Sequence, residues 1–255
     1  MSKRLPTLSY RRPMDSIFIV SPCSGRVIEA NTHKNDNGAL KRSYAAFELM
    51  DKCRREGIVQ PNERIYTSFI RALAKGKAPN MPKKASLLLQ RMQELYDAGN
   101  KGIKPTVFTY NAVLYACAES LADEDTSNLE AFKIAIGIFS TLRNKERGEE
   151  PDHVSFGNIL RCAPLLPEGE KKDALIKATF RLCCDSGFVN SYVVRDIQYA
   201  ASEELWRSML NCPQGDVDMD RFPPDWTSSF EVKKPAPRRD MKPRGRDMKP
   251  RRGSR

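Results

Sequence analysis

Three segments of this 255-residue chain repeat the same order of helix-breaking and apolar residues, and this repeat restricts the possible folds. Pro61, Pro105 and Pro151 are separated by 44 and 46 residues. An aromatic residue follows each proline five positions later: Tyr66, Tyr110 and Phe156. A period of this size is typical of proteins built from repeated pairs of helices.

Other residue types recur at nearly fixed distances from the three prolines. The glycines before the prolines are Gly57, Gly102 and Gly148, the apolar pairs after the rings begin at Phe69, Val113 and Ile159, and the small residues that follow include Ala72, Ala116 and Cys162. A glycine can adopt a positive φ and end one helix, and a proline prevents that helix from continuing. The ring and the apolar pair, at positions i, i+3 and i+4, form the apolar stripe of the next helix. A single hairpin cannot bury such a stripe, so the hairpins must stack.

We therefore predict an all-α fold: a short right-handed α-solenoid of stacked helical hairpins over residues 38–211, with disordered basic termini. The alternation of polar and β-branched residues that is typical of strands is scarce. Residues 1–37 form a disordered or targeting N-terminus. Residues 212–230, rich in proline and containing Trp226, form a connector that we expect to pack on the last helices.

The net charge of +11 resides at the two ends of the chain. Residues 231–255 hold eleven Lys and Arg against three acidic residues, and residues 1–40 hold six against three. The remaining residues, 41–230, hold 26 of each sign. The predicted helical body is therefore neutral overall, and attraction to a polyanion would have to come mainly from the ends.

The C-terminal segment 231–255 has no apolar periodicity and contains a duplication, RDMKPRG followed by RDMKPRR, at 239–252. Such a segment cannot bury enough apolar surface to offset its loss of conformational entropy, so we predict disorder. A flexible basic arm of this kind can contact phosphates, although it can also serve only to keep the protein soluble. The candidate phosphate-contacting residues are Arg238, Arg239, Lys242, Arg244, Arg246, Lys249, Arg251 and Arg252.

Several classes of function find no support in the sequence. The seven cysteines include no CxxC pair and there are only two histidines, so a structural zinc site is not expected. No nucleophile elbow, P-loop or dinucleotide-binding motif occurs. We expect no enzyme activity, no cofactor, no metal and no small-molecule substrate. No run of about 18 apolar residues is present, so we expect no membrane helix.

The segments GIKPTVFTYNAVLYACA (102–118) and EPDHVSFGNILRCA (150–163) resemble pentatricopeptide repeats, and GIVQPNERIYTSFIRALA (57–74) does so more weakly. The resemblance extends over about 40–210, with a degenerate trailing unit at 188–210. It implies single-stranded RNA as the partner, bound at about one base per repeat.

The resemblance also implies which residues contact the bases. The residue after each aromatic ring reads a base together with the last residue of the repeat. Asn111 with Asp152 then form one reader, with uracil as the expected base, and Thr67 with Thr106 form a second. Gly157 stands at the third reading position and has no side chain to read with. Without the resemblance, the position of Asp152 directly after Pro151 is that of a helix N-cap.

In the same family the residue two positions before the ring sandwiches the base. Phe108 and Val154 fit this role, while Arg64 departs from the pattern but can stack through its guanidinium plane. Asn111, Thr67 and Thr106 can also be ordinary polar residues of a helix surface.

Three hypotheses about function follow. The first is a non-enzymatic RNA-binding adaptor in RNA processing, stability or translation, in a mitochondrion or plastid by family habit and otherwise cytoplasmic. Its further partner would be a processing enzyme or a ribosomal component. The second is a protein-interaction scaffold built on a HEAT-like or tetratricopeptide-like array. In the third, the helical body is inert and the basic tail alone anchors the protein to ribosomal RNA or to acidic partners. Polar side chains along the inner helices would favour RNA, and an apolar groove would favour a peptide.

Overall fold

The computed structural model describes residues 38–122, 127–144, 149–210 and 217–231, together with Ile28 and Ala30. These residues form ten α-helices and no strand, so the prediction of an all-α fold is confirmed for them. The helices are α2 (Ala39–Arg55), α3 (Glu63–Lys75), α4 (Met81–Asp97), α5 (Val107–Ala118), α6 (Asn128–Arg143), α7 (His153–Arg161), α8 (Glu170–Asp185), α9 (Ser191–Ala200), α10 (Glu203–Leu210) and α11 (Pro224–Glu231).

The repeated prolines mark where α3, α5 and α7 begin. The residue after each proline is the N-cap: Asn62, Thr106 and Asp152. The Asn62 side chain accepts a hydrogen bond from the Ile65 N–H at 3.2 Å, and this satisfies a donor that the first helical turn leaves free. Helix α9 begins in the same way, with Asn190 accepting from the Val193 N–H at 2.9 Å. Here Val189 precedes the cap in place of a proline.

The glycine that ends α4 is not the one predicted. Gly57, after α2, has a φ of +72°, as its role as a helix terminator requires. After α4, however, the positive φ of +106° belongs to Gly99, while Gly102 lies within a 3₁₀ turn at Lys101–Ile103. Helix α4 ends three residues earlier than the proline spacing suggests, because that turn fills the distance. Gly148 lies outside the described residues.

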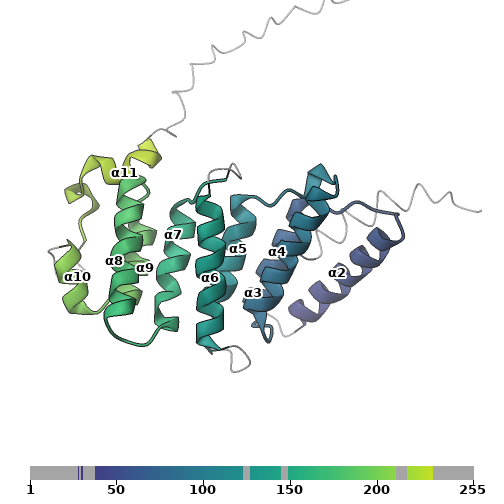
Figure 1. The fold of residues 1–255 in the computed structure, drawn as a ribbon, viewed down its shortest axis with the longest axis horizontal. Coiled ribbons are helices and arrows are strands. Elements are labelled where there is room, and N and C mark those ends of the chain that lie inside the picture. Colours follow the sequence, from purple (N-terminus) through teal and green to yellow (C-terminus); the bar gives the residue numbers. More distant parts are fainter. Residues whose placement is uncertain are drawn as a thin grey trace, which may run out of the picture.

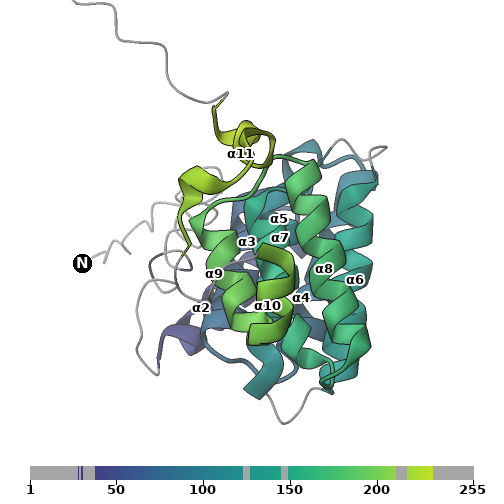
Figure 2. The ribbon, with the colours of Figure 1, turned by 90° about the vertical axis from the view of Figure 1, so that its left-hand side faces the viewer.

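The helices are arranged in two layers along an elongated row (Figure 1). Helices α3, α5, α7 and α9 pack against one another in sequence order and form one layer. Helix α4 packs on α6, and a 3₁₀ turn at Ala163–Leu165 contacts both α6 and α8. Figure 2, seen along the row, separates the layer of α3, α5, α7 and α9 from the layer that contains α4, α6 and α8.

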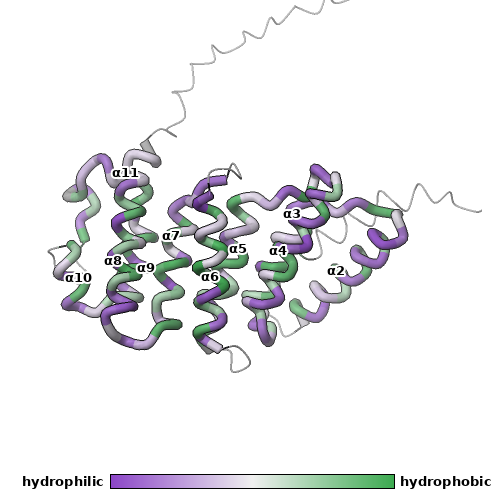
Figure 3. The backbone as a smooth tube through the Cα atoms, in the orientation of Figure 1, coloured by the Kyte–Doolittle hydropathy of each residue, from purple (hydrophilic) through white to green (hydrophobic). Residues whose placement is uncertain are grey.

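The core lies between the two layers and consists of two hydrophobic clusters. Tyr66, Tyr110 and Phe156, the rings of the repeat, are all buried. Helix α5 contributes to both hydrophobic clusters of the core, with Tyr110 and Val113 in one and Leu114 in the other. Hydrophilic and hydrophobic residues alternate within most of the helices (Figure 3), as expected when one face of each helix is buried.

Helix α11 lies against the end of the row. Its Trp226 ring packs edge-to-face on Phe180 of α8, with 5.5 Å between the ring centroids. The Val189 N–H donates to the Trp226 carbonyl at 2.8 Å, and the Ser229 N–H donates to the Gly187 carbonyl at 3.1 Å. These contacts connect the segment that follows α10 to the turn before α9.

Other sequence predictions concern residues outside those described. The N-terminal segment is described only at Ile28, Ala30 and from Gly38 onward, and the basic tail only at Glu231, the last residue of α11. The eight candidate phosphate-contacting residues between Arg238 and Arg252 therefore lie outside the described residues. In the described part of the chain, none of the helices combines the length and the apolar character that crossing a membrane requires.

Candidate nucleic-acid interface

Helices α3, α5, α7 and α9 present one open groove of about 470 Å³. All its lining residues come from these four helices and from Asp152, the N-cap of α7. Asn111, Asp152, Thr67, Phe108 and Val154, five of the seven body residues proposed to contact bases, line it. The residues predicted from three separate repeats thus meet in one place.

Asn111 and Asp152, the pair that the resemblance predicts to read a base, are in direct contact across α5 and α7. The Asn111 amide Nδ2 donates to the Asp152 Oδ1 at 2.9 Å, and the Asn111 Oδ1 accepts from the Ser155 hydroxyl at 2.6 Å. Asp152 also accepts from the Ser155 N–H at 2.9 Å and so caps α7. Because a primary amide has two N–H groups and two lone pairs, Asn111 retains one donor and one acceptor position.

Thr67 and Thr106 meet through a third residue. The Thr67 hydroxyl donates to Glu63 Oε1 at 2.8 Å, and the Thr106 hydroxyl donates to the same oxygen at 3.1 Å. Thr109 also donates to that oxygen, at 3.1 Å, and its hydroxyl lies 2.8 Å from that of Thr67. The sequence predictions missed Glu63, which here holds all three hydroxyl groups and leaves Thr67 buried. Thr106 is not among the residues that line the groove.

Apolar side chains stand exposed along the edge of the groove. Phe108 is 71% exposed and Val154 is 43% exposed, which is unusual for apolar residues on helices that otherwise bury such side chains. Both lie two residues after the N-cap of their helix. Tyr192 occupies the same position in α9 and is 59% exposed. Arg64 holds this position in α3; it is exposed and does not line the groove.

The groove carries more positive than negative charge, although residues 41–230 are neutral overall. Its lining includes two carboxylates, Asp152 and Asp196, and four cationic side chains: Arg71, Lys75, Arg161 and Arg195. The Arg161 guanidinium lies 5.5 Å from the centroid of the Tyr115 ring and forms an ion pair with Glu119. Burial raises the pKa of Tyr115, so this ring remains a neutral platform.

The sequence predictions missed the contribution of α9. Tyr192, Arg195 and Asp196 all line the groove, yet the trailing unit was interpreted as degenerate. The signal was present at Asn190: Tyr192 follows this cap by two residues, as Phe108 follows Thr106. Val189 stands where the other repeats have proline, so the proline spacing does not mark the start of this helix.

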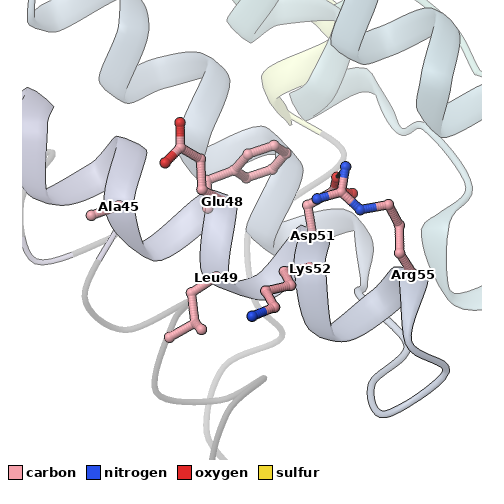
Figure 4. A pocket seen from close by; sticks show the side chains of 7 residues that line it. Ala45, Glu48, Leu49, Asp51, Lys52 and Arg55 are labelled. Atoms are coloured by element: carbon pink, nitrogen blue, oxygen red, sulfur yellow. Dashed lines mark ion pairs between the residues drawn. The ribbon is translucent and has the colours of Figure 1, made fainter.

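A second pocket, of about 590 Å³, lies along α2 (Figure 4). All its lining residues belong to that one helix, and Asp51 is held there by Arg54 at 2.8 Å and by Arg91 of α4 at 2.9 Å. An open surface on a single helix offers no opposing wall to hold a ligand. Within the described ranges, no three histidine, cysteine, aspartate or glutamate side chains are grouped closely enough to bind a metal ion.

Comparison of this chain with models of protein families, with curated proteins and with solved structures found no match.

Proposed function

We propose that the protein binds single-stranded RNA in the groove of α3, α5, α7 and α9, as a short right-handed solenoid of the pentatricopeptide type. The observation that carries this proposal is the direct contact of Asn111 with Asp152 on the groove wall. This contact joins two residues that are 41 positions apart in sequence. The family resemblance predicts that both of them contact the base.

The chemistry of this pair suits a pyrimidine base. One N–H and one lone pair of the Asn111 amide remain for a base edge that presents both an acceptor and a donor, and uracil does so. The Asp152 carboxylate fixes the orientation of the amide. Phe108 and Val154 stand exposed on the two helices that carry the pair, so a base can stack between them. Stacking on a side chain contributes about 1–3 kcal/mol per base.

Electrostatic attraction supports the same assignment. Arg71, Arg161 and Arg195 line the groove, so phosphates entering it meet several guanidinium groups. The basic tail adds eleven cationic residues within 25. We infer that the groove supplies selectivity and that the tail supplies much of the affinity.

On this proposal the protein acts by binding and not by catalysis. It holds an RNA for processing, stabilisation or translation in a mitochondrion or plastid, and a processing enzyme or a ribosomal component completes the task.

The test is selection of RNAs from a random single-stranded pool with the full chain and three variants. Asn111→Ala removes the reader. Gln93→Ala is the matched control, because this half-buried amide on α4 also donates to a carboxylate, that of Asp97, but lies outside the groove. The third variant replaces the eight candidate tail residues by glutamine.

The full chain and the Gln93→Ala variant should both enrich a short motif that contains uridine, and Asn111→Ala should lose it. The tail variant should retain the motif with weaker binding. For this variant, the slope of the logarithm of the binding constant against the logarithm of the salt concentration should be shallower by about 5 to 6, if all eight tail residues contact phosphates. If binding instead disappears with the tail charges and Asn111→Ala changes nothing, the tail is the RNA contact. The apolar edge of the groove would then favour the scaffold hypothesis, with a peptide as its occupant.

A further inference from the structure

The reading position of α7 is filled by a side chain from the next helix. Thr67, Asn111 and Gly157 each lie five residues after the N-cap of their helix, so they are equivalent along the row. Gly157 is buried and has no side chain of its own. A Cβ atom placed on it would lie only 2.5 Å from Oδ2 of Asp196 on α9. The Asp196 carboxylate therefore occupies the volume in which the equivalent side chains stand at Thr67 and Asn111.

This carboxylate has unused capacity to accept hydrogen bonds. The Asp196 side chain is 14% exposed, and its Oδ1 lies 3.6 Å from Nη2 of Arg195, a long ion pair. Its polar neighbour is Arg195, through this long contact, whereas Asp152 accepts from both the Asn111 amide and the Ser155 N–H. A carboxylate at the wall of a groove, open on one side, is free to accept bonds from a ligand.

Aromatic and aliphatic surfaces flank Asp196 as they flank Asn111. Val154 on α7 and Tyr192 on α9 are both exposed, two residues after their N-caps, and both line the groove with Asp196. Arg161 lines it as well, so a phosphate near this position has a cationic partner. These surroundings resemble those of Asn111, except that the side chain placed to contact the base, Asp196, comes from α9 instead of α7.

We propose that Asp196 reads a guanine in the register of Gly157, next to the base that Asn111 reads. The proposal rests on the proposed function. An ionised carboxylate only accepts hydrogen bonds, and guanine offers two adjacent donors, the N1–H and the N2 amino group. Uracil presents a single N–H between two acceptors, while adenine and cytosine each place a donor beside an acceptor nitrogen. Guanine is therefore the base whose edge matches both carboxylate oxygens.

The test measures fluorescence anisotropy of the full chain with short labelled RNAs. Each RNA carries guanine, adenine or cytosine beside the selected uridine, on the 5′ side in one series and on the 3′ side in the other. In one of the two series the guanine RNA should bind about tenfold more tightly than the adenine RNA. Asp196→Asn should reduce that difference to about twofold or less, because an amide presents one acceptor in place of two.

Two further variants control for effects on folding and on charge. Gly157→Ala leaves Asp196 in the chain but places a methyl group 2.5 Å from its carboxylate, which must then move, so this variant should also lose the guanine preference. Asp185→Asn removes an exposed carboxylate of α8 outside the groove and should keep it. Far-ultraviolet circular dichroism verifies that each variant is folded.

The outcomes separate this inference from the proposed function. If the wild-type chain selects uridine but not an adjacent guanine, or if Asp196→Asn keeps the guanine preference, the role of Asp196 is refuted and RNA binding in the groove stands. If the chain selects neither base, the proposed function fails together with this inference.

Discussion

Replacing Asp152 by alanine removes two different kinds of hydrogen bond at once. The Asp152 carboxylate caps α7 by accepting from the Ser155 N–H at 2.9 Å, and it binds the Asn111 amide of α5 at 2.9 Å. The first bond stabilises one helix, while the second joins two repeats. Asn190 supplies a comparison, because its side chain caps α9 through the Val193 N–H and makes no other hydrogen bond within the described residues.

The two variants should differ measurably in the free energy of unfolding. Loss of an N-cap destabilises by about 1 kcal/mol, which is the whole effect expected for Asn190→Ala. A hydrogen bond to a charged acceptor contributes about 1.5 kcal/mol, so Asp152→Ala should destabilise by about 2.5 kcal/mol in total. Asn111→Ala removes this second bond together with the bond from the Ser155 hydroxyl to Asn111 Oδ1. The double variant should therefore lose about 1.5 kcal/mol less than the sum of the two single losses.

Urea denaturation followed by circular dichroism at 222 nm measures these differences. The dependence of the unfolding free energy on urea concentration verifies that the variants expose the same surface area on unfolding. Equal losses for Asp152→Ala and Asn190→Ala would mean that the contact with Asn111 contributes nothing to stability and that Asn111 and Asp152 are not coupled. Additive losses in the double variant would lead to the same conclusion.

Two further predictions follow from buried ionisable groups. Burial raises the pKa of the Cys117 thiol to about 12, so a thiol reagent at pH 8 should leave Cys117 unmodified in the folded protein and modify it rapidly in urea. Peptide mass spectrometry measures the modification. Modification of the folded protein at the rate of a free thiol would contradict this prediction. Burial also raises the pKa of Asp196 above its ordinary 3.8, with Arg195 and Arg161 opposing the shift, so at neutral pH the ionised carboxylate lowers the stability of the fold. Asp196→Asn should therefore be more stable than the wild type at pH 7, and this difference should vanish as the pH falls below about 4. Urea midpoints measured across this range test the prediction, and a lower midpoint for the variant than for the wild type at pH 7 would disprove it.

The starts of α3, α5 and α7 could be predicted from sequence because the signals are local. A proline followed by Asn, Thr or Asp determines where a helix begins within one or two residues, and each ring takes its place in the buried stripe. Helix α9 shows the limit of this approach. It has the same cap at Asn190, but Val189 replaces the proline, so the sequence pattern predicts only a degenerate unit there.

The distribution of charge could not be predicted from composition. Counting residues 41–230 gives zero net charge, and this suggested a body without attraction for nucleic acid. The fold gathers Arg71, Arg161 and Arg195 into one groove because they lie on the same face of neighbouring helices. Local potential depends on which face of each helix the charged groups occupy, and the net charge of a segment does not contain that information.

The amino-acid sequence by itself therefore determined the class of fold, the period of the helical hairpins and the residues that enter the core. These follow from backbone and packing preferences that act over a few positions. Only the tertiary structure decided what lies beside what: that Asn111 meets Asp152, that Glu63 gathers the hydroxyl groups of Thr67 and Thr106, and that Asp196 fills the position over Gly157. Contacts between residues about 40 positions apart depend on how successive helices pack, and that geometry is set by the whole core and not by any single segment.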